Sequence, residues 1–114
     1  MAAGIAQPTQ TMSGFVDAAK LISMCTDAGP AAAAARAVCL GYVVGSVDQL
    51  MAQQARREEA RRTICPPKTF TADQAVQAVV RHPTFAAKGV GIGASAYVRF
   101  AMEQAYPCTH ATRR

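Results

Sequence analysis

Apolar residues recur at intervals of three and four over most of the chain, which is the spacing of one face of an α-helix. The pattern predicts helices over residues 14–26, 30–62, 71–81 and 94–106, joined by short connections. We therefore expect an all-α fold, a compact bundle of about four helices. The longest predicted helix has the clearest apolar stripe, which comprises Leu40, Val43, Val44, Val47, Leu50, Met51 and Ala55.

The other predicted helices have shorter apolar faces with the same periodicity. The first presents Phe15, Ala18, Ala19, Ile22 and Met24; the third presents Ala75, Val76, Val79 and Val80; the last presents Ala94, Tyr97, Val98, Ala101, Met102 and Ala105. Because an amphipathic helix turns its apolar face inward, we expect these residues to form the core.

Capping and turn residues place the ends of the helices. Ser13 can cap the first helix, and Pro30 separates it from the second, where proline suits the first helical position. Thr71 and Gln74 fit a capping box at the start of the third. From Gln53 onward the second helix is polar on every side, so its last turns are expected to project into solvent.

Residues 13–108 are predicted to form one helical domain, because a chain of 114 residues favours a single core. Residues 1–12 are small and polar and are expected to be a flexible lead-in, and residues 109–114 a flexible tail. The lead-in lacks the charged and apolar regions of a signal peptide. We interpret the chain as a mature form from which a leader has been removed.

Glycines interrupt two of the predicted helices. Gly41 and Gly45 lie four residues apart on the second helix, beside Tyr42, and each costs helix stability relative to alanine. Two readings are open: a close helix crossing within the fold, or a contact in a symmetric dimer. The glycine-rich stretch 89–93 lacks both the strand context of a dinucleotide loop and the Gly-Lys-Ser/Thr of a phosphate loop, so a flexible helix entry is favoured.

The formal net charge is +5 and the sequence pI is about 9.4, which raises nucleic acid as a partner. The densest basic run, residues 56–62, is interrupted by Glu58 and Glu59. Its arginines are Arg56, Arg57, Arg61 and Arg62. A run of mixed sign is typical of a solvated helical face, so no nucleic-acid partner is predicted. No stretch reaches the roughly 20 apolar residues that a membrane span needs.

Four cysteines stand at or near predicted helix ends: Cys25, Cys39, Cys65 and Cys108. An even number in a short chain indicates disulfides and an oxidising compartment, the alternative being a cytosolic protein with free thiols. Three pairings are possible. Position favours Cys25 with Cys39, across the turn between the first two helices, which leaves Cys65 with Cys108, each just after a predicted helix.

Metal-binding or catalytic use of the polar residues is not predicted. The cysteine intervals of 14, 26 and 43 lack the close pairs of structural zinc sites, and His82 and His110 lie far apart. No local sequence gives a cysteine the activating partner of a catalytic thiolate, and no carboxylate pair is spaced for acid–base chemistry. We expect a protein with no cofactor and no enzymatic activity.

The order of these motifs over residues 13–108 resembles the Rap/Tai immunity family, which is associated with type VI secretion amidase effectors. The resemblance rests on the runs CLGYVVGSVD at 39–48, ICPP at 64–67, VVRHP at 79–83 and AYPC at 105–108. It implies a small, all-helical, periplasmic protein that is commonly homodimeric and has intramolecular disulfides.

The resemblance also implies a function. Such a protein would be a non-enzymatic immunity protein that binds a peptidoglycan amidase delivered by a neighbouring cell and occludes its active-site groove. No partner-binding residue is carried over to this chain. The alternative is a periplasmic helical protein with a structural or chaperone-like role and no toxin partner.

The cysteine assignment is testable by mass. Native protein is expected to be lighter than reduced protein by the mass of four hydrogens, because each of two disulfides replaces two S–H bonds. Intact mass spectrometry with and without reductant measures the difference. Four alkylatable thiols in the purified native protein would contradict the assignment.

Overall fold

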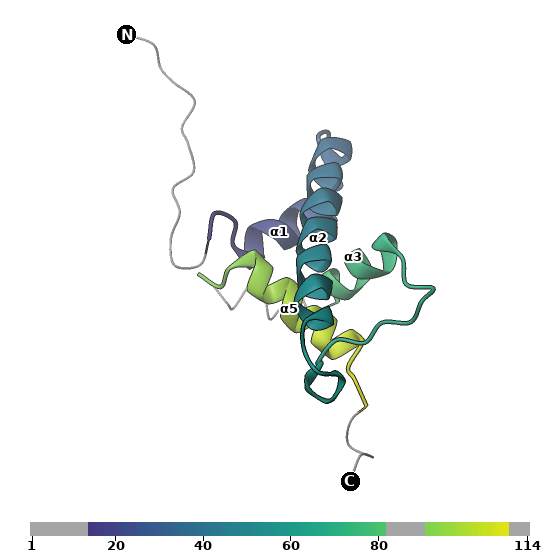
Figure 1. Ribbon diagram of the computed structural model, residues 1–114. Helices are drawn as coiled ribbons and strands as arrows, with labels where there is room; N and C mark the ends of the chain where they lie inside the picture. The colour runs from purple at the N-terminus through teal and green to yellow at the C-terminus, as the bar shows by residue number, and fades with distance from the viewer. Residues whose placement is uncertain (1–13, 82–90, 110–114) are drawn as a thin grey trace.

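The computed structural model describes residues 14–81 and 91–109. Within that part of the chain the elements are α1 (Ala18–Thr26), α2 (Ala32–Ala55), a short 3-10 helix η1 (Glu59–Arg61), α3 (Ala72–Val80) and α5 (Ala94–Ala105). The long helix α2 is the axis of the fold, and α1, α3 and α5 all contact it (Figure 1). The prediction of an all-α helical bundle is confirmed. The expected flexible lead-in, residues 1–12, and His82 and His110 lie outside the described residues.

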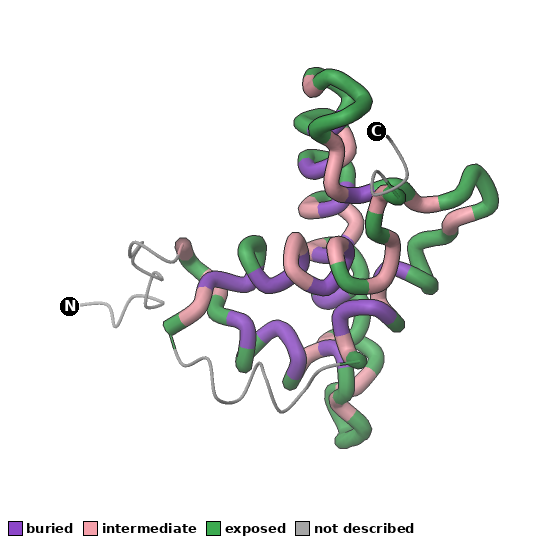
Figure 2. The backbone as a smooth tube through the Cα atoms, turned by 90° about the horizontal axis from the view of Figure 1, so that it is seen from below, coloured by how far each residue is buried: buried purple, intermediate pink, exposed green. Residues whose placement is uncertain are grey.

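The core forms where α1, α2, α3 and α5 meet, and Figure 2 shows the buried segments gathered there. It is built of small and medium side chains, with Tyr97 the largest that is fully buried. Its residues are Ala18, Leu21, Ile22, Cys25, Cys39, Val43, Val47, Leu50, Ile64, Ala75, Ala78, Val79, Ala94, Tyr97, Val98, Ala101 and Met102. Within the described residues, no helix is long and apolar enough to cross a membrane.

Helix α1 begins at Ala18, so the predicted start at residue 14 was wrong. Asp17 caps it, because the Asp17 carboxylate accepts a hydrogen bond from the Lys20 amide at 2.7 Å. The backbone before the cap pairs instead with the start of α5: the Ala94 amide donates to the Val16 carbonyl at 2.8 Å. Just after the cap, the Ala18 amide donates to the Ile92 carbonyl, also at 2.8 Å. Phe15 is consequently 60% exposed, and not part of the helix face on which it was expected.

The inward face of α1 is therefore narrower than predicted. Ala18 and Ile22 are buried as expected, but Ala19 is exposed and Met24 only half-buried. Leu21, which the sequence reading left out, is fully buried. The helix ends at the turn before Pro30, as expected, with Asp27 accepting a hydrogen bond from the Gly29 amide.

The predicted apolar stripe of α2 is only partly buried. Val43, Val47 and Leu50 of the predicted stripe are buried, but Leu40 is 45% exposed and Ala55 is exposed. The stripe was predicted too wide because three shorter helices cover only part of the circumference of α2. Its first turns, residues 32–38, are exposed or half-buried and rise above the packed helices in Figure 1.

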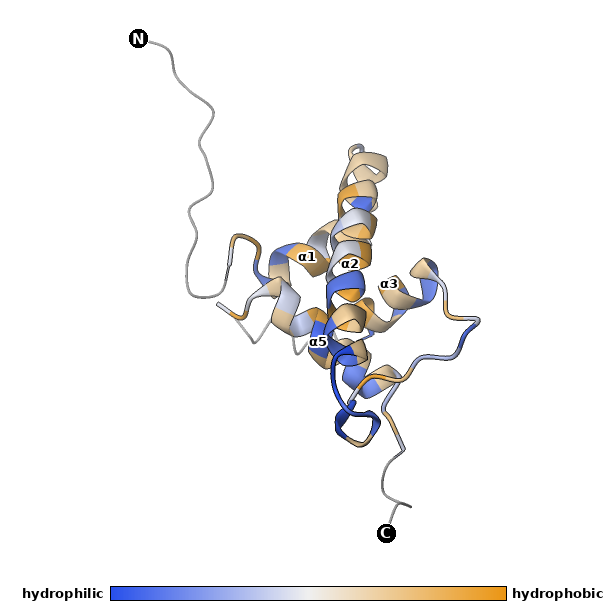
Figure 3. Cartoon of the chain, in the orientation of Figure 1, coloured by the Kyte–Doolittle hydropathy of each residue, from blue (hydrophilic) through white to orange (hydrophobic). Residues whose placement is uncertain are grey.

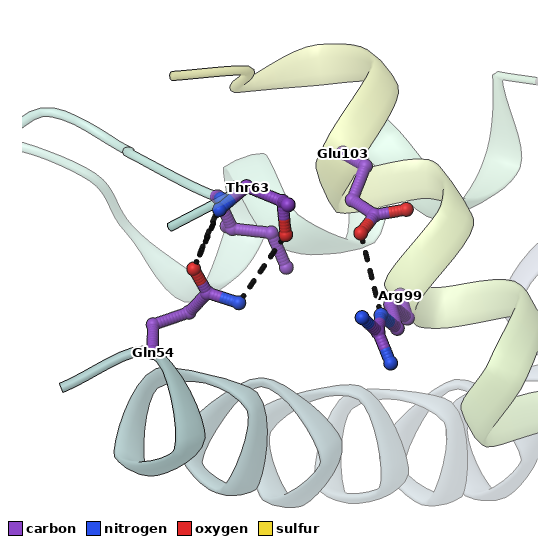
Figure 4. A network of polar contacts seen from close by, with 5 residues as sticks. Gln54, Thr63, Arg99 and Glu103 are labelled. Atoms are coloured by element: carbon purple, nitrogen blue, oxygen red, sulfur yellow. Dashed lines mark hydrogen bonds and ion pairs between the residues drawn. The ribbon is translucent and has the colours of Figure 1, made fainter. Parts of the chain in front are cut away.

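The end of α2 also differs from the prediction. The helix stops at Ala55, and the chain turns back through the loop 56–62, the most hydrophilic part of the ribbon in Figure 3, instead of continuing to residue 62. The cause is Gln54, which is 97% buried (3% exposed). Its side-chain oxygen accepts hydrogen bonds from the amides of Thr63 at 2.8 Å and Ile64 at 3.2 Å (Figure 4). A polar residue thus fixes the reversal that buries Ile64.

Helices α3 and α5 agree closely with the prediction. The capping box of Thr71 and Gln74 is present. Helix α5 buries its expected stripe apart from half-buried Ala105. The Tyr97 hydroxyl donates to the Val79 carbonyl of α3 at 2.8 Å, which ties the two helices together inside the core. Before α5, Gly91 has a φ of +90°, a conformation that favours glycine.

Both predicted disulfides are present. Cys25–Cys39 joins the end of α1 to α2, with a Cα–Cα distance of 5.1 Å; Cys65–Cys108 joins the segment after η1 to the end of α5, at 5.0 Å. The closed loops of 14 and 43 residues contribute roughly 3 and 4 kcal/mol in the chain-entropy model. Each amount is a substantial part of the roughly 5–15 kcal/mol of net stability of a domain, so loss of one disulfide weakens the fold while the other remains.

Removal of the Gln54 side chain tests the reversal after α2. Gln54→Ala is expected to lower the free energy of unfolding by about 2 kcal/mol, because it leaves the amides of Thr63 and Ile64 without their acceptor. Urea denaturation measures the change. Gln53→Ala, at the exposed neighbouring position, is the matched control and should stay within about 0.5 kcal/mol. Equal effects of the two substitutions would contradict the role of Gln54.

Candidate interaction surface

The described residues hold no cluster of three or more His, Cys, Asp or Glu side chains that could bind a metal ion. All four cysteines are in disulfides, so none is a thiolate in this form of the protein. The described residues also form surface grooves that another molecule could contact.

One such surface is a groove of about 640 Å³ between α2 and α5. We call it the α2–α5 groove. Its lining residues are Gly41, Tyr42, Gly45, Ser46, Gln49, Leu50 and Gln53 from α2, and Ser95, Ala96 and Arg99 from α5. The α2 wall includes Gly41, Gly45 and Ser46, so the backbone of α2 lies close to the surface at these positions.

The sequence-predicted residues Gly41, Tyr42 and Gly45 all line this groove. Both glycines are exposed, and a Cβ built on either would meet no heavy atom within 4 Å. The described residues therefore supply no close helix crossing at these glycines. The second reading, a contact with another chain, stays a prediction.

Three further residues in or beside the groove were not predicted from the sequence. Val38 lies on the same helix face as Gly41, Tyr42 and Gly45, three to seven residues away, and is 55% exposed. Gln49 continues the face in the other direction. Val38 and Gln49 could have been predicted from their helical spacing, seven residues before Gly45 and four residues after it. Arg99 comes from α5, and no feature of the neighbouring sequence predicts its place in the groove.

Arg99 is the charged residue of the α2–α5 groove. Its Nε lies 3.3 Å from the Glu103 carboxylate one turn along α5, and both side chains are partly exposed (Figure 4). An exposed pair at this spacing contributes only about 0.3–0.5 kcal/mol. Either partner can therefore be drawn to a charged group on another molecule at small cost to the fold.

A second pocket, of about 350 Å³, lies between α2 and α3. One side consists of Val44, Val47 and Met51 of α2. Another side consists of residues from the segment before α3, namely Pro66, Pro67, Lys68 and Phe70. We call residues 65–71 the proline segment. Phe70 packs edge-on against Tyr106 with ring centroids 4.9 Å apart, which joins this segment to the end of α5.

The basic run 56–62 is not the helical face that the sequence predicted. It forms a turn followed by η1, and the Arg61–Glu58 pair at 3.6 Å is about 80% exposed on both sides. Arg62 has an internal role, because its Nε donates to the carbonyls of Gln54 and Arg57. The other three arginines, Arg56, Arg57 and Arg61, line one open hollow together with Glu58.

The family model described as Rap1a immunity proteins matches residues 17–108. No curated protein and no solved structure matches the chain. Because the match spans most of the sequence, the chain belongs to the Rap1a immunity protein family, which confirms the suspected Rap/Tai-type relationship.

The open space at Gly45 gives a stability prediction. Gly45→Ala is expected to raise the free energy of unfolding by about 0.5–1 kcal/mol, because alanine favours the helix and its methyl group meets no neighbour. Thermal or urea unfolding of dilute protein measures the gain. Gly29→Ala is the control. Gly29 lies in a turn, where an added Cβ would stand 3.3 Å from the Asp27 carboxylate, so this substitution should not raise the free energy of unfolding. Destabilisation by Gly45→Ala would contradict the open geometry.

Proposed function

We propose that this member of the Rap1a immunity protein family is a periplasmic protein that binds a peptidoglycan amidase delivered by a type VI secretion system and blocks its substrate groove. The family match over residues 17–108 carries the proposal, because that family implies immunity to a secreted effector. Members are generally inhibitors without catalytic activity of their own. The two disulfides support an oxidising compartment such as the periplasm.

The mechanism we propose is occlusion by a preformed surface. The core and the two disulfides hold the helices in place before binding, so little conformational entropy is lost on association. The protein then acts as a plug, which excludes the cell-wall peptide without any covalent step. Inhibition of this kind is stoichiometric: the fraction of amidase that is inactive equals the fraction that is bound.

We further propose that the chain forms a homodimer through the face of α2 that contains Gly41, Tyr42 and Gly45. Glycines in the middle of an exposed helix face cost stability in the monomer, and the α2–α5 groove leaves room for a second backbone to approach. The exposed Val38 beside them adds apolar area. A stable interface needs about 1,200–2,000 Å² of buried surface in total, so neighbouring residues must take part.

Titration of an amidase tests the inhibitor function. Hydrolysis of purified peptidoglycan by candidate type VI amidase effectors is measured at increasing ratios of this chain. Activity is expected to fall linearly and to vanish near equimolar ratio for the cognate effector. Undiminished activity across the panel at severalfold excess would contradict the amidase assignment and favour a structural or chaperone-like role.

A bulky side chain in the groove tests the dimer. Gly45→Leu is expected to shift the protein from dimer to monomer in sedimentation velocity while leaving its far-UV circular dichroism unchanged. Ala33→Leu adds the same side chain at an exposed position on a different side of α2, outside the groove, and should leave the dimer intact. A monomeric parent protein, or a dimer that tolerates Gly45→Leu, would count against this interface.

A further inference from the structure

The two disulfides differ sharply in how far solvent reaches them. Cys25 is 9% and Cys39 only 2% exposed, and both belong to the core cluster between α1 and α2. Cys65 is exposed and Cys108 half-buried, and both lie outside the helices. Thiol–disulfide exchange requires a thiolate to reach one of the sulfur atoms, so access governs its rate.

The surroundings reinforce this difference. To expose Cys25–Cys39, α1 must separate from α2, which disrupts the buried contacts of Leu21 and Val43. Around Cys65–Cys108, the backbone contact is local: the Cys65 amide donates to the Tyr106 carbonyl at 2.8 Å, beside a single bridge between Ile64 and Pro107. An incoming thiolate therefore meets one disulfide directly and the other only after partial unfolding.

We propose that Cys65–Cys108 is a thiol–disulfide exchange site for an external dithiol, while Cys25–Cys39 is closed to exchange in the folded protein. A thiolate of the dithiol attacks Sγ of the exposed Cys65, and the bond to Cys108 breaks. Sγ of Cys108 leaves as a thiolate and takes up a proton. The second thiol of the dithiol then displaces Cys65, so the protein gains two electrons and two protons and the dithiol becomes a disulfide.

The fold indicates what this exchange changes. Helix α5 stays in place without the disulfide, because Tyr97, Val98 and Met102 are fully buried and Tyr97 is bonded to Val79 of α3. The proline segment, in contrast, loses its covalent tether at Cys65. Pro66, Pro67, Lys68 and Phe70 of this segment form one wall of the α2–α3 pocket. Exchange at Cys65–Cys108 thus loosens that wall while the bundle persists, whatever partner the protein binds.

Kinetics of reduction test the site. Native protein is treated with limiting dithiothreitol, quenched with N-ethylmaleimide at intervals, and mapped by peptide mass spectrometry. Labels on Cys65 and Cys108 are expected to appear faster than those on Cys25 and Cys39, on the order of tenfold or more. Equal rates, or earlier labelling of Cys25 and Cys39, would overturn the proposal.

A denatured control separates burial from intrinsic reactivity. In urea above the unfolding midpoint the two rates should converge, because access is then equal. If the same order and ratio persist in urea, the difference does not come from the fold, and the structural basis of the proposal fails.

Limited trypsin digestion tests the consequence for the proline segment. The paired substitutions Cys65→Ser and Cys108→Ser are expected to keep the helical circular dichroism and to speed cleavage after exposed Lys68 severalfold relative to the parent protein. The matched pair Cys25→Ser and Cys39→Ser leaves Cys65–Cys108 intact. If cleavage after Lys68 is unchanged by loss of Cys65–Cys108, or helical signal is lost with it, the proposed loosening is overturned.

Discussion

Burial of one side of α2 is the constraint on which the rest of this structure depends. Helices α1, α3 and α5 each contact α2, and their core residues meet around Val43, Val47 and Leu50. The three covering helices have 9, 9 and 12 residues against the 24 of α2, so they cannot enclose it. One side of α2 therefore belongs to the core, and another side, with Val38, Gly41 and Gly45, faces solvent. A single helix thus provides both the apolar side that stabilises the fold and an accessible side that a binding partner can contact.

The parts of the fold that could be predicted are those fixed by residues close in sequence. The capping box at Thr71 and Gln74 and the stripe of α5 follow from local chemistry and periodicity, and the pairing of Cys25 with Cys39 follows from the turn between two helices. The misplaced helix ends have long-range causes. Helix α1 starts late because residues before Asp17 pair with the entry to α5, and α2 stops early because Gln54 binds the amides of Thr63 and Ile64. A buried glutamine among exposed polar neighbours has no distinguishing mark in the sequence.

The candidate interaction surface, too, could be predicted only in part from the sequence. Gly41, Tyr42 and Gly45 could be singled out because glycine is costly inside a helix, yet the sequence could not decide whether they face the protein's own core or another chain. A Cβ at either glycine would meet no neighbouring element of the described structure, so no close crossing within the described fold accounts for them. Arg99 joins the groove only because α5 packs across α2. Family membership supplies the biological setting, immunity to a secreted effector, and the structure supplies a rigid, disulfide-linked helical scaffold on which such recognition can rest.

Native-state amide hydrogen exchange along α2 tests the central claim most directly. If the other helices all depend on α2, the amides of residues 43–50 exchange only through global unfolding, with opening free energies equal to the free energy of unfolding from denaturation. The exposed first turns at 32–38 exchange faster. Exchange of 43–50 through local opening, while α1 and α3 remain protected, would contradict the account.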